Sequence, residues 1–528
     1  MRNGARAAAA AEGLPAALVG KDAGLWGDAA REEASIRLGW LNLPESSADL
    51  LPRLDQMRDD ALRDGLDHVV LCGMGGSSLA PEVIAATAGV GLTVLDSTDP
   101  DQISRTLGDR LDRTIVVVSS KSGGTIETET QSLAFLDAFR AAGLDDKAAA
   151  QRLVAVTDPG SPLEQRATDE GWREVVQADP NVGGRYSALS AFGLVPCALA
   201  GVDVGPLLEQ ARALLPALGS GTGNPGLDLG AALGAGWTVG RDKVVLADAG
   251  SGIVGFGDWA EQLIAESTGK EGRGLLPVVV EGVDAPGFAT AGADAHLVVL
   301  GTPPDGFVGT AVTGPLGAQF LLWEYAVAVA GRILSINPFD QPNVQEAKDL
   351  TKRLLGSAQG GQLPEGEPAF VDGAVAVYAE PSVLGEARDV PAVLDLLCRA
   401  VPDRGYLAVL TYLDRLGDAD AAWLRREVAT RLGDRQVTFG WGPRYLHSTG
   451  QYHKGGPQHG VFLEITGEPR ADLPIPGRPY TFRTLQLAQA LGDLNALTST
   501  GRPGVRLHLT DRQAGVRQLL DAARKGRE

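Results

Sequence analysis

The stretch DHVVLCGMGG, residues 67–76, joins a run of apolar, β-branched residues directly to a glycine-rich turn. A continuous apolar run of this length is typical of a strand that is buried on both faces of a sheet. Helix-like sequence separates it from three stretches of the same design: LTVLDSTDP at 92–100, RTIVVVSSKSGG at 113–124 and QRLVAVTDPGS at 151–161. This alternation predicts a doubly wound parallel sheet, with ligands bound at the carboxyl ends of its strands.

The same alternation returns after LGSGTGNPGLDLG (218–230), which we interpret as a linker because it is rich in glycine and proline. A third region follows a further break at 357–370, and the sequence leaves open whether it is a domain of its own or completes the second sheet. We expect an α/β protein with two doubly wound parallel-sheet domains and an additional C-terminal α/β region. The predicted boundaries are 1–60 for a helical lead-in, 61–217 and 231–356 for the two sheet domains, and 366–528 for the last region.

The composition excludes several classes of protein. The 528 residues include 47 Lys+Arg and 66 Asp+Glu, a net charge of −19, which disfavours binding to nucleic acid or anionic membranes. No apolar run reaches the roughly 18 residues of a membrane span, and no signal peptide is recognisable, so we expect a cytoplasmic protein. Cys72, Cys197 and Cys398 are far apart in apolar surroundings, which indicates neither a disulfide framework nor a metal cluster.

Two glycine-containing turns carry candidate ligand-binding groups. GMGGSSLAP (73–81) contains Gly76 and Ser77 and is not a dinucleotide-binding fingerprint, so a plain tight turn and a ligand loop both remain open. SSKSGGTIETET (119–130) places the hydroxyl groups of Ser120, Ser122 and Thr125 and one of only nine lysines, Lys121, around two glycines. Such a segment can hold a phosphate between a strand and a helix N-terminus, the alternative being an ordinary helix cap.

Three further segments bear charged side chains beside turns. NVGGRYSALSAFGL (181–194) lets the Arg185 guanidinium and the backbone approach one anionic oxygen. IAESTGKEGRG (264–274) places Glu266 at the end of a helix, where it is either a proton-transfer base or a solvated charge. SINPFDQPNVQEAKDLTKRL (335–354) sets Gln341 in a turn and Lys348 on the helix that follows.

The segments GMGGSSLAP, SSKSGGT, VGGRYS, ESTGK and FDQPNVQEAK occur in the order found in the glucose-6-phosphate isomerase family, which the chain resembles. It resembles in particular the isomerase half of transaldolase/glucose-6-phosphate isomerase fusion proteins. The resemblance implies two sugar-isomerase domains, a homodimer, and interconversion of glucose 6-phosphate and fructose 6-phosphate through an enediol(ate). That reaction requires neither a metal nor a redox cofactor.

The resemblance also implies roles for individual residues. Glu266 would move a proton between C1 and C2, and Arg185 would stabilise the enediolate. Lys348 would assist ring opening and line the site together with Gln341. The residues implied to bind the substrate and its phosphate are Gly76, Ser77, Ser120, Lys121, Ser122, Thr125 and Gly184.

The chain departs from the family at the ring-opening histidine, which the family carries in a GQH segment between the Glu and FDQ motifs. Here that interval contains only His296, in a strand-like context. The segment GWGPRYLHSTGQYHKGGPQHG (440–460) is rich in histidine, and we hypothesise that His453 or His447 has taken the role. The alternatives are turn histidines without a catalytic duty and, less favoured, a three-histidine metal site.

Other functions on the same scaffold remain open. A non-catalytic phosphosugar-binding regulator usually adds a basic DNA-binding module, which residues 1–66 do not show. Amidotransfer, epimerisation and the isomerisation of another phosphosugar are further alternatives. An amidotransferase would need an N-terminal glutaminase with a nucleophilic cysteine, and none of the three cysteines is suitably placed. The co-occurrence of Glu266, Arg185 and Lys348 favours an isomerase, although not strict glucose over mannose phosphate specificity, and leaves association with a separate transaldolase undecided.

Overall fold

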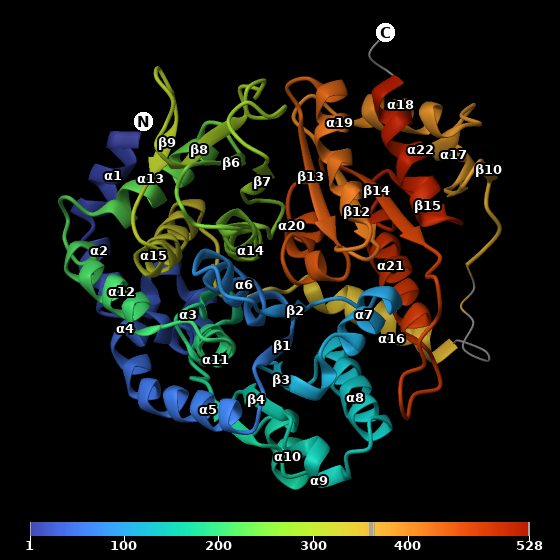
Figure 1. Ribbon diagram of the computed structural model, residues 1–528. Helices are drawn as coiled ribbons and strands as arrows, with labels where there is room; N and C mark the ends of the chain where they lie inside the picture. The colour runs from blue at the N-terminus through green and yellow to red at the C-terminus, as the bar shows by residue number, and fades with distance from the viewer. Residues whose placement is uncertain (1, 358–362, 364, 526–528) are drawn as a thin grey trace.

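The computed structural model describes residues 2–357, 363 and 365–525 (Figure 1). Within this part of the chain every helix is too short or too polar to cross a lipid bilayer. Residues 2–63 are mainly helical. The first helix of this segment, α1, packs against the helix α13 (Pro225–Thr238) of the second sheet unit. Its helices are α1 (Arg2–Ala11), α2 (Leu14–Val19), α3 (Asp28–Ser35), α4 (Leu43–Ser46) and α5 (Leu51–Arg63).

The first sheet is parallel throughout, in the order β2-β1-β3-β4-β5. Its three central strands are buried along their whole length, which explains their continuous apolar sequence. The strands are β1 (His68–Gly73), β2 (Thr93–Leu95), β3 (Thr114–Ser119), β4 (Leu153–Thr157) and β5 (Glu174–Gln177). The helices around it are α6 (Leu79–Thr87), α7 (Pro100–Gly108), α8 (Ile126–Ala141), α9 (Asp146–Ala150), α10 (Pro162–Asp169) and α11 (Ala191–Ala200).

The second sheet repeats this design with the order β7-β6-β8-β9, again parallel. In both sheets the first strand of the unit is central, and the next two strands in sequence lie on either side of it. The strands are β6 (Lys243–Ala249), β7 (Leu276–Val280), β8 (Ala295–Gly301) and β9 (Thr310–Val312). The helices are α12 (Gly205–Leu218), α13 (Pro225–Thr238), α14 (Phe256–Thr268) and α15 (Leu316–Leu334).

The predicted linker is wrong in its second half, because α13 begins at Pro225. Asn224 caps this helix by accepting a hydrogen bond from the backbone N–H of Leu227 at 2.9 Å. Proline at the first helical position and asparagine before it are helix-start signals, and the glycine content of the segment obscured them.

The third region forms a separate six-stranded sheet, in the order β10-β11-β15-β14-β12-β13. It therefore does not complete the second sheet, and the chain has the predicted α/β class, with two parallel sheets and a further mixed one. The strands are β10 (Phe370–Asp372), β11 (Val375–Tyr378), β12 (Tyr406–Tyr412), β13 (Gln436–Trp441), β14 (Gly460–Gly467) and β15 (Gly504–Leu509). The helices are α16 (Val344–Ser357), α17 (Pro381–Leu384), α18 (Val390–Ala400), α19 (Trp423–Leu432), α20 (Gly450–Gly455), α21 (Phe482–Thr498) and α22 (Arg512–Lys525).

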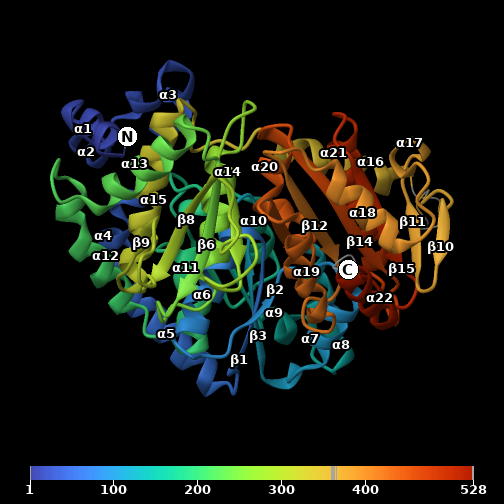
Figure 2. The same cartoon turned by 90° about the horizontal axis from the view of Figure 1, so that it is seen from above.

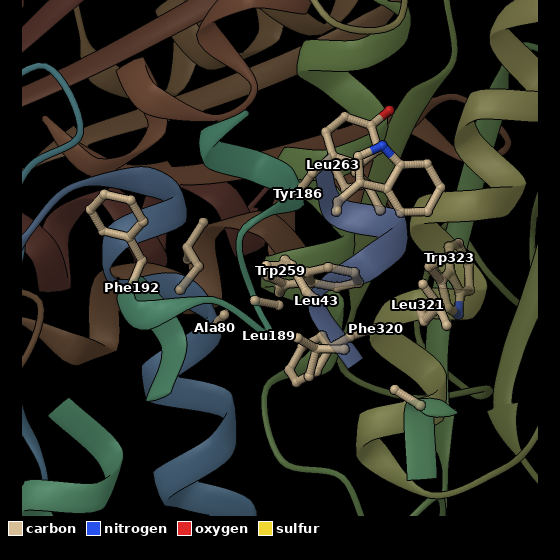
Figure 3. Close-up of a cluster of buried hydrophobic side chains, with 14 of the residues drawn as sticks. Leu43, Ala80, Tyr186, Leu189, Phe192, Trp259, Leu263, Phe320, Leu321 and Trp323 are labelled. Atoms are coloured by element: carbon tan, nitrogen blue, oxygen red, sulfur yellow. The ribbon is translucent and has the colours of Figure 1, made fainter. Parts of the chain in front are cut away.

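One hydrophobic cluster joins the first two sheet units. Figure 3 shows Trp259 of α14 among side chains from several elements, Leu43 and Phe320 included, and its ring centroid lies 4.8 Å from that of Phe320. The helix α14 is therefore packed tightly between the two units, which fixes the position of the side chains at its C-terminal end.

The third sheet stands beside the second in Figure 2, and its loops contact the carboxyl edge of the first. Buried ion pairs make this contact: Arg444 reaches Asp96 at 2.7 Å, and Arg512 reaches Asp99 at 2.8 Å. Because Asp96 and Asp99 follow β2, these pairs bring the histidine-rich segment of the third region to the edge where the first sheet is predicted to bind ligands.

Candidate active site

Arg185 is the centre of the site. It lies in a short 3-10 turn, Gly184–Tyr186, and only 3% of its surface is exposed. Its guanidinium approaches the carboxylate of Glu266, with 3.2 Å between Nη1 and Oε2. It also donates hydrogen bonds to the hydroxyl of Ser267 (2.8 Å), to the side-chain oxygen of Gln341 (2.8 Å) and to the carbonyl oxygens of Pro338 (2.6 Å) and Asp340 (3.0 Å). These bonds hold the cation in one orientation.

Glu266 lies in the last turn of α14 and is 8% exposed, so the interpretation as a solvated helix-end charge is wrong. Besides Arg185, its carboxylate accepts a hydrogen bond from the side-chain amide of Gln262 at 3.3 Å. Burial raises the pKa of Glu266 above its usual value, and the charge of Arg185 opposes this rise. A carboxyl group with a raised pKa beside a fixed cation suits proton transfer near neutral pH.

Lys270 is a site residue that the sequence analysis did not assign. Its ammonium group is buried and donates hydrogen bonds to the carbonyl oxygens of Asn337 (2.7 Å) and Asp340 (2.6 Å) and to the Asp340 carboxylate (2.6 Å). Burial lowers its pKa to about 8. Lys270 and Arg185 thus hold the FDQ turn from two sides. The sequence contained a signal for Lys270, because it is one of only nine lysines and lies in the ESTGK motif.

His447 and Glu127 form a pair at the edge of the first sheet. Nε2 of His447 lies 3.0 Å from a carboxylate oxygen of Glu127, which is in the first turn of α8. Burial acts to raise the pKa of Glu127. The charge of His447 and its hydrogen bond have a larger, opposite effect, so the pKa of Glu127 lies below its usual value. The carbonyl oxygen of His447 accepts a hydrogen bond from Gln262 at 2.8 Å. Gln262 therefore connects His447 directly to Glu266.

His453 has a different environment. It is 1% exposed, and its Nδ1 lies 3.0 Å from the hydroxyl of Tyr406 on β12, against whose ring it stacks. Its Nε2 has no hydrogen-bond partner in the described part of the chain. Burial lowers the pKa of His453 well below its usual value. The structure encloses this histidine among aromatic side chains of the hydrophobic cluster between the second and third sheets, and it has no hydrogen bond to Glu266.

The loop between β3 and α8 carries the three hydroxyl side chains that the sequence analysis assigned to an anion site. The hydroxyls of Ser120 and Thr125 lie 3.0 Å apart, and Ser122 is exposed. Thr125 is the residue preceding α8, but its side chain makes no cap hydrogen bond, so the helix-cap alternative does not account for it. Lys121 forms an ion pair with Asp158 and donates to the carbonyl oxygen of Pro180 at 3.1 Å.

The GMGGSS loop touches the Arg185 turn. A Cβ atom at Gly76 would collide with the carbonyl oxygen of Gly184, so only glycine permits this approach. Ser77 is buried beside it. The close contact brings the loop after β1 next to the turn that carries Arg185.

The FDQ motif contributes Gln341 to the site, and the helix that follows it carries Lys348. Gln341 is exposed apart from its bond to Arg185, and Lys348 is exposed on α16. The charge of Lys348 contributes to lowering the pKa of Glu127, which places the lysine within electrostatic range of the His447–Glu127 pair. No group of three His, Cys, Asp or Glu side chains arranged for a metal occurs within the described residues.

Comparison with known proteins agrees with this geometry. The phosphoglucose isomerase family model matches residues 60–214. The glucose-6-phosphate isomerase of Synechococcus elongatus is 36% identical over 393 residues, covering 62% of this chain and 73% of that relative. That of Synechococcus sp. strain JA-2-3B'a(2-13) is 29% identical over 455 residues, 78% of either chain.

Among solved structures, a hypothetical protein from Thermus thermophilus superimposes with a TM-score of 0.56 at 26% identity, over 62% of this chain and 92% of that one. A glucose-6-phosphate isomerase from Chlamydia trachomatis, at 21% identity and a TM-score of 0.51 over 62% and 74%, shows the shared fold. The fold, with a buried carboxylate held against a fixed cation, defines a sugar-phosphate isomerase. By its sequence relatives the chain belongs to the glucose-6-phosphate isomerase family.

Proposed function

We propose that this enzyme interconverts glucose 6-phosphate and fructose 6-phosphate through an enediolate, with Glu266 as the base. The observation that carries the proposal is the buried contact of 3.2 Å between Glu266 and Arg185. Aldose–ketose isomerisation needs one carboxylate that removes a proton and returns it to the neighbouring carbon, and a fixed positive charge at the developing oxyanion. The raised pKa of Glu266 makes it a stronger base than an ordinary carboxylate.

Arg185 stabilises the enediolate. Because four acceptors besides Glu266 already fix its guanidinium, little reorganisation is needed as negative charge develops on the substrate. Arginine stays protonated throughout, so its fixed positive charge stabilises the developing oxyanion without a proton transfer.

The substrate phosphate binds at the loop 119–125. Hydroxyl groups of Ser120, Ser122 and Thr125 donate to its oxygens, and α8 offers backbone N–H groups that no side chain caps. The turn at Gly76 and Ser77 completes this side of the site. Lys121, held beside the loop by Asp158, adds positive potential in a chain of net charge −19.

Ring opening falls to His447, with Glu127 and Lys348 beside it. Glu127 accepts the hydrogen bond of Nε2 and so leaves Nδ1 to exchange a proton with the sugar. His453 is left out of this proposal because its ring is enclosed by core side chains. The histidine thus comes from the third region, as hypothesised for the segment 440–460.

A coupled assay that follows glucose 6-phosphate formation from fructose 6-phosphate tests the proposal. Turnover in the wild type, together with loss of turnover in a Glu266→Gln variant that still binds substrate, supports it. Binding without turnover in the wild type would instead indicate a phosphosugar-binding regulator. The same assay with mannose 6-phosphate as substrate tests specificity.

We further propose a cytoplasmic homodimer, on the strength of the family relationship. Sedimentation equilibrium measures its mass directly: the chain has a mass of 54.9 kDa, and a dimer has twice that value. A single species at the mass of one chain over the micromolar range contradicts the dimer.

A further inference from the structure

A cavity of about 210 Å³ lies at the carboxyl edge of the second sheet, where β6, β8 and β9 end. Its floor is apolar, and hydroxyl and amide groups surround it. The lining residues used below are Ser251, Phe256, Thr302, Thr313, Gly314 and Gln319. None belongs to the candidate active site: α14 begins at this cavity with Phe256 and carries Glu266 ten residues later, about 15 Å further along the helix.

The position of the cavity follows from the topology. In the second sheet the chain order reverses at β6, as it does at β1 in the first. Open α/β sheets bind ligands outside the carboxyl ends of the strands at such a reversal. The loops after β6 and β8 correspond to those after β1 and β3, which are GMGGSS and SSKSGGT. The cavity therefore occupies the place in the second unit that the proposed phosphate loop occupies in the first.

Two helix N-termini meet at the cavity. Phe256 opens α14, and Gly314 immediately precedes the first residues of α15; the rings of Phe256 and Phe320 lie 5.9 Å apart. The residues before the two helices are Gly255 and Pro315, and neither supplies a side-chain cap. Uncapped N–H groups and the positive ends of two helix dipoles favour an anion. The carboxylate of Asp248 opposes this at the rim, where it accepts from the N–H groups of Gly250 and Ser251.

Gln319 provides an independent indication of a ligand. Its side chain is 3% exposed and lines the cavity. The indole N–H of Trp323 donates to its oxygen at 3.2 Å, which fixes the orientation of the amide. No hydrogen bond joins the NH₂ group to a described residue, so this donor is left to face the cavity. A buried donor held in place and facing a cavity indicates an acceptor that binds there.

We propose that this cavity binds a small oxyanion, a phosphoryl or carboxylate group on a compact ligand. The amide of Gln319 and the hydroxyls of Ser251, Thr302 and Thr313 donate to the ligand, and the two helix N-termini supply the positive potential. No lysine or arginine lines the cavity among the described residues, so the affinity depends on hydrogen bonds more than on net charge.

Calorimetric titration of the full-length protein with inorganic phosphate tests this. We expect two sites in the wild type. Gln319→Leu, which removes the donor, and Ser251→Phe, which fills the cavity, each leave one site. A Ser120→Ala/Thr125→Val double variant also leaves one, and combining it with Gln319→Leu leaves none. Gln165→Leu, an exposed glutamine on α10, is the matched control and keeps both.

The outcomes separate this proposal from the proposed function. If the wild type has one site and the Ser120→Ala/Thr125→Val variant loses it, the proposed binding at the cavity is wrong and the proposed phosphate binding at the loop is supported. If the wild type has one site and both Gln319→Leu and Ser251→Phe lose it, the proposed binding at the loop is wrong and binding at the cavity is supported. Titration with acetate distinguishes a carboxylate site, because acetate heat that is abolished by Gln319→Leu and by Ser251→Phe, and kept in the Ser120→Ala/Thr125→Val variant, identifies that preference. Unchanged turnover of fructose 6-phosphate in Gln319→Leu, measured without phosphate, shows that this variant is folded.

Discussion

Two regions of this protein bury ionisable side chains, and they do so in opposite ways. Around Arg185 the buried charges are paired, and Glu266 has a cation at 3.2 Å. In the polar cluster under the third sheet, which we define as Tyr412, Tyr445, His453, Glu464 and Asp493, Asp493 is paired with Lys454, but both carboxylate oxygens of Glu464 and Nε2 of His453 have no partner in the described chain. Burial raises the pKa of Glu464 well above its usual value.

The difference teaches that burial of an ionisable group does not by itself mark a catalytic site. Glu464 lies within β14, between strands on both sides, where no substrate reaches it. Glu266 lies at a helix end beside a fixed guanidinium and glycine-rich loops. The charge partner and the neighbouring loops distinguish the proposed base from a carboxyl group that is merely enclosed.

The sharpest test of this contrast is to replace each buried carboxylate by its amide. Glu266→Gln removes the base, and we expect kcat to fall by about 10²–10⁴-fold while hexose phosphate binding is retained. Glu464→Gln should leave kcat within a factor of two. Steady-state kinetics and calorimetric binding measure both. Equal losses in the two variants would show that the contrast is structural rather than catalytic.

The two histidines extend the contrast to ring opening. We expect His447→Gln to reduce turnover of cyclic fructose 6-phosphate by roughly 10–100-fold, because the general acid–base partner is lost. His453→Gln should keep turnover near the wild-type value once its folded fraction is confirmed by circular dichroism. The hypothesis fails if only His453→Gln, properly folded, loses activity.

Glu464→Gln should also change the dependence of stability on pH. Because its pKa is raised on folding, the folded state binds more protons than the unfolded state above pH 4.5, and stability falls as pH rises. Replacing the carboxyl removes this decline. We expect the variant to gain about 1–3 kcal/mol relative to the wild type at pH 8, with a smaller difference at pH 5. Urea unfolding at the two pH values measures the free energy of unfolding. If that free energy depends on pH in the variant as it does in the wild type, the assignment is contradicted.

The smallest expected effect is in the pH–rate profile. Proton abstraction needs ionised Glu266, so kcat/KM falls when pH drops through its pKa, which burial raises above the model-peptide value of 4.5. The acidic limb of kcat/KM should therefore lie above pH 4.5. A limb at or below that pH would show that Glu266 titrates as an ordinary exposed carboxylate.

Local patterns sufficed for much of the fold. Apolar runs predicted the parallel strands, and the five motifs predicted the residues around Arg185. Glu127 lay in a quoted segment yet was not assigned, because its partner His447 is 320 residues away and no local pattern shows the pair. The choice between His447 and His453 was equally out of reach, since the contact with Tyr406 on another strand decides it.

The contact between Glu127 and His447 also sets the order in which the enzyme becomes active during synthesis. At about 5–20 residues per second, a ribosome needs roughly 15–60 seconds to translate the 320 residues that separate the two. During that time the growing chain already contains Arg185 and then Glu266, but it lacks His447, the histidine proposed to open the sugar ring. On this proposal, ring opening is the last step of catalysis that the nascent protein acquires.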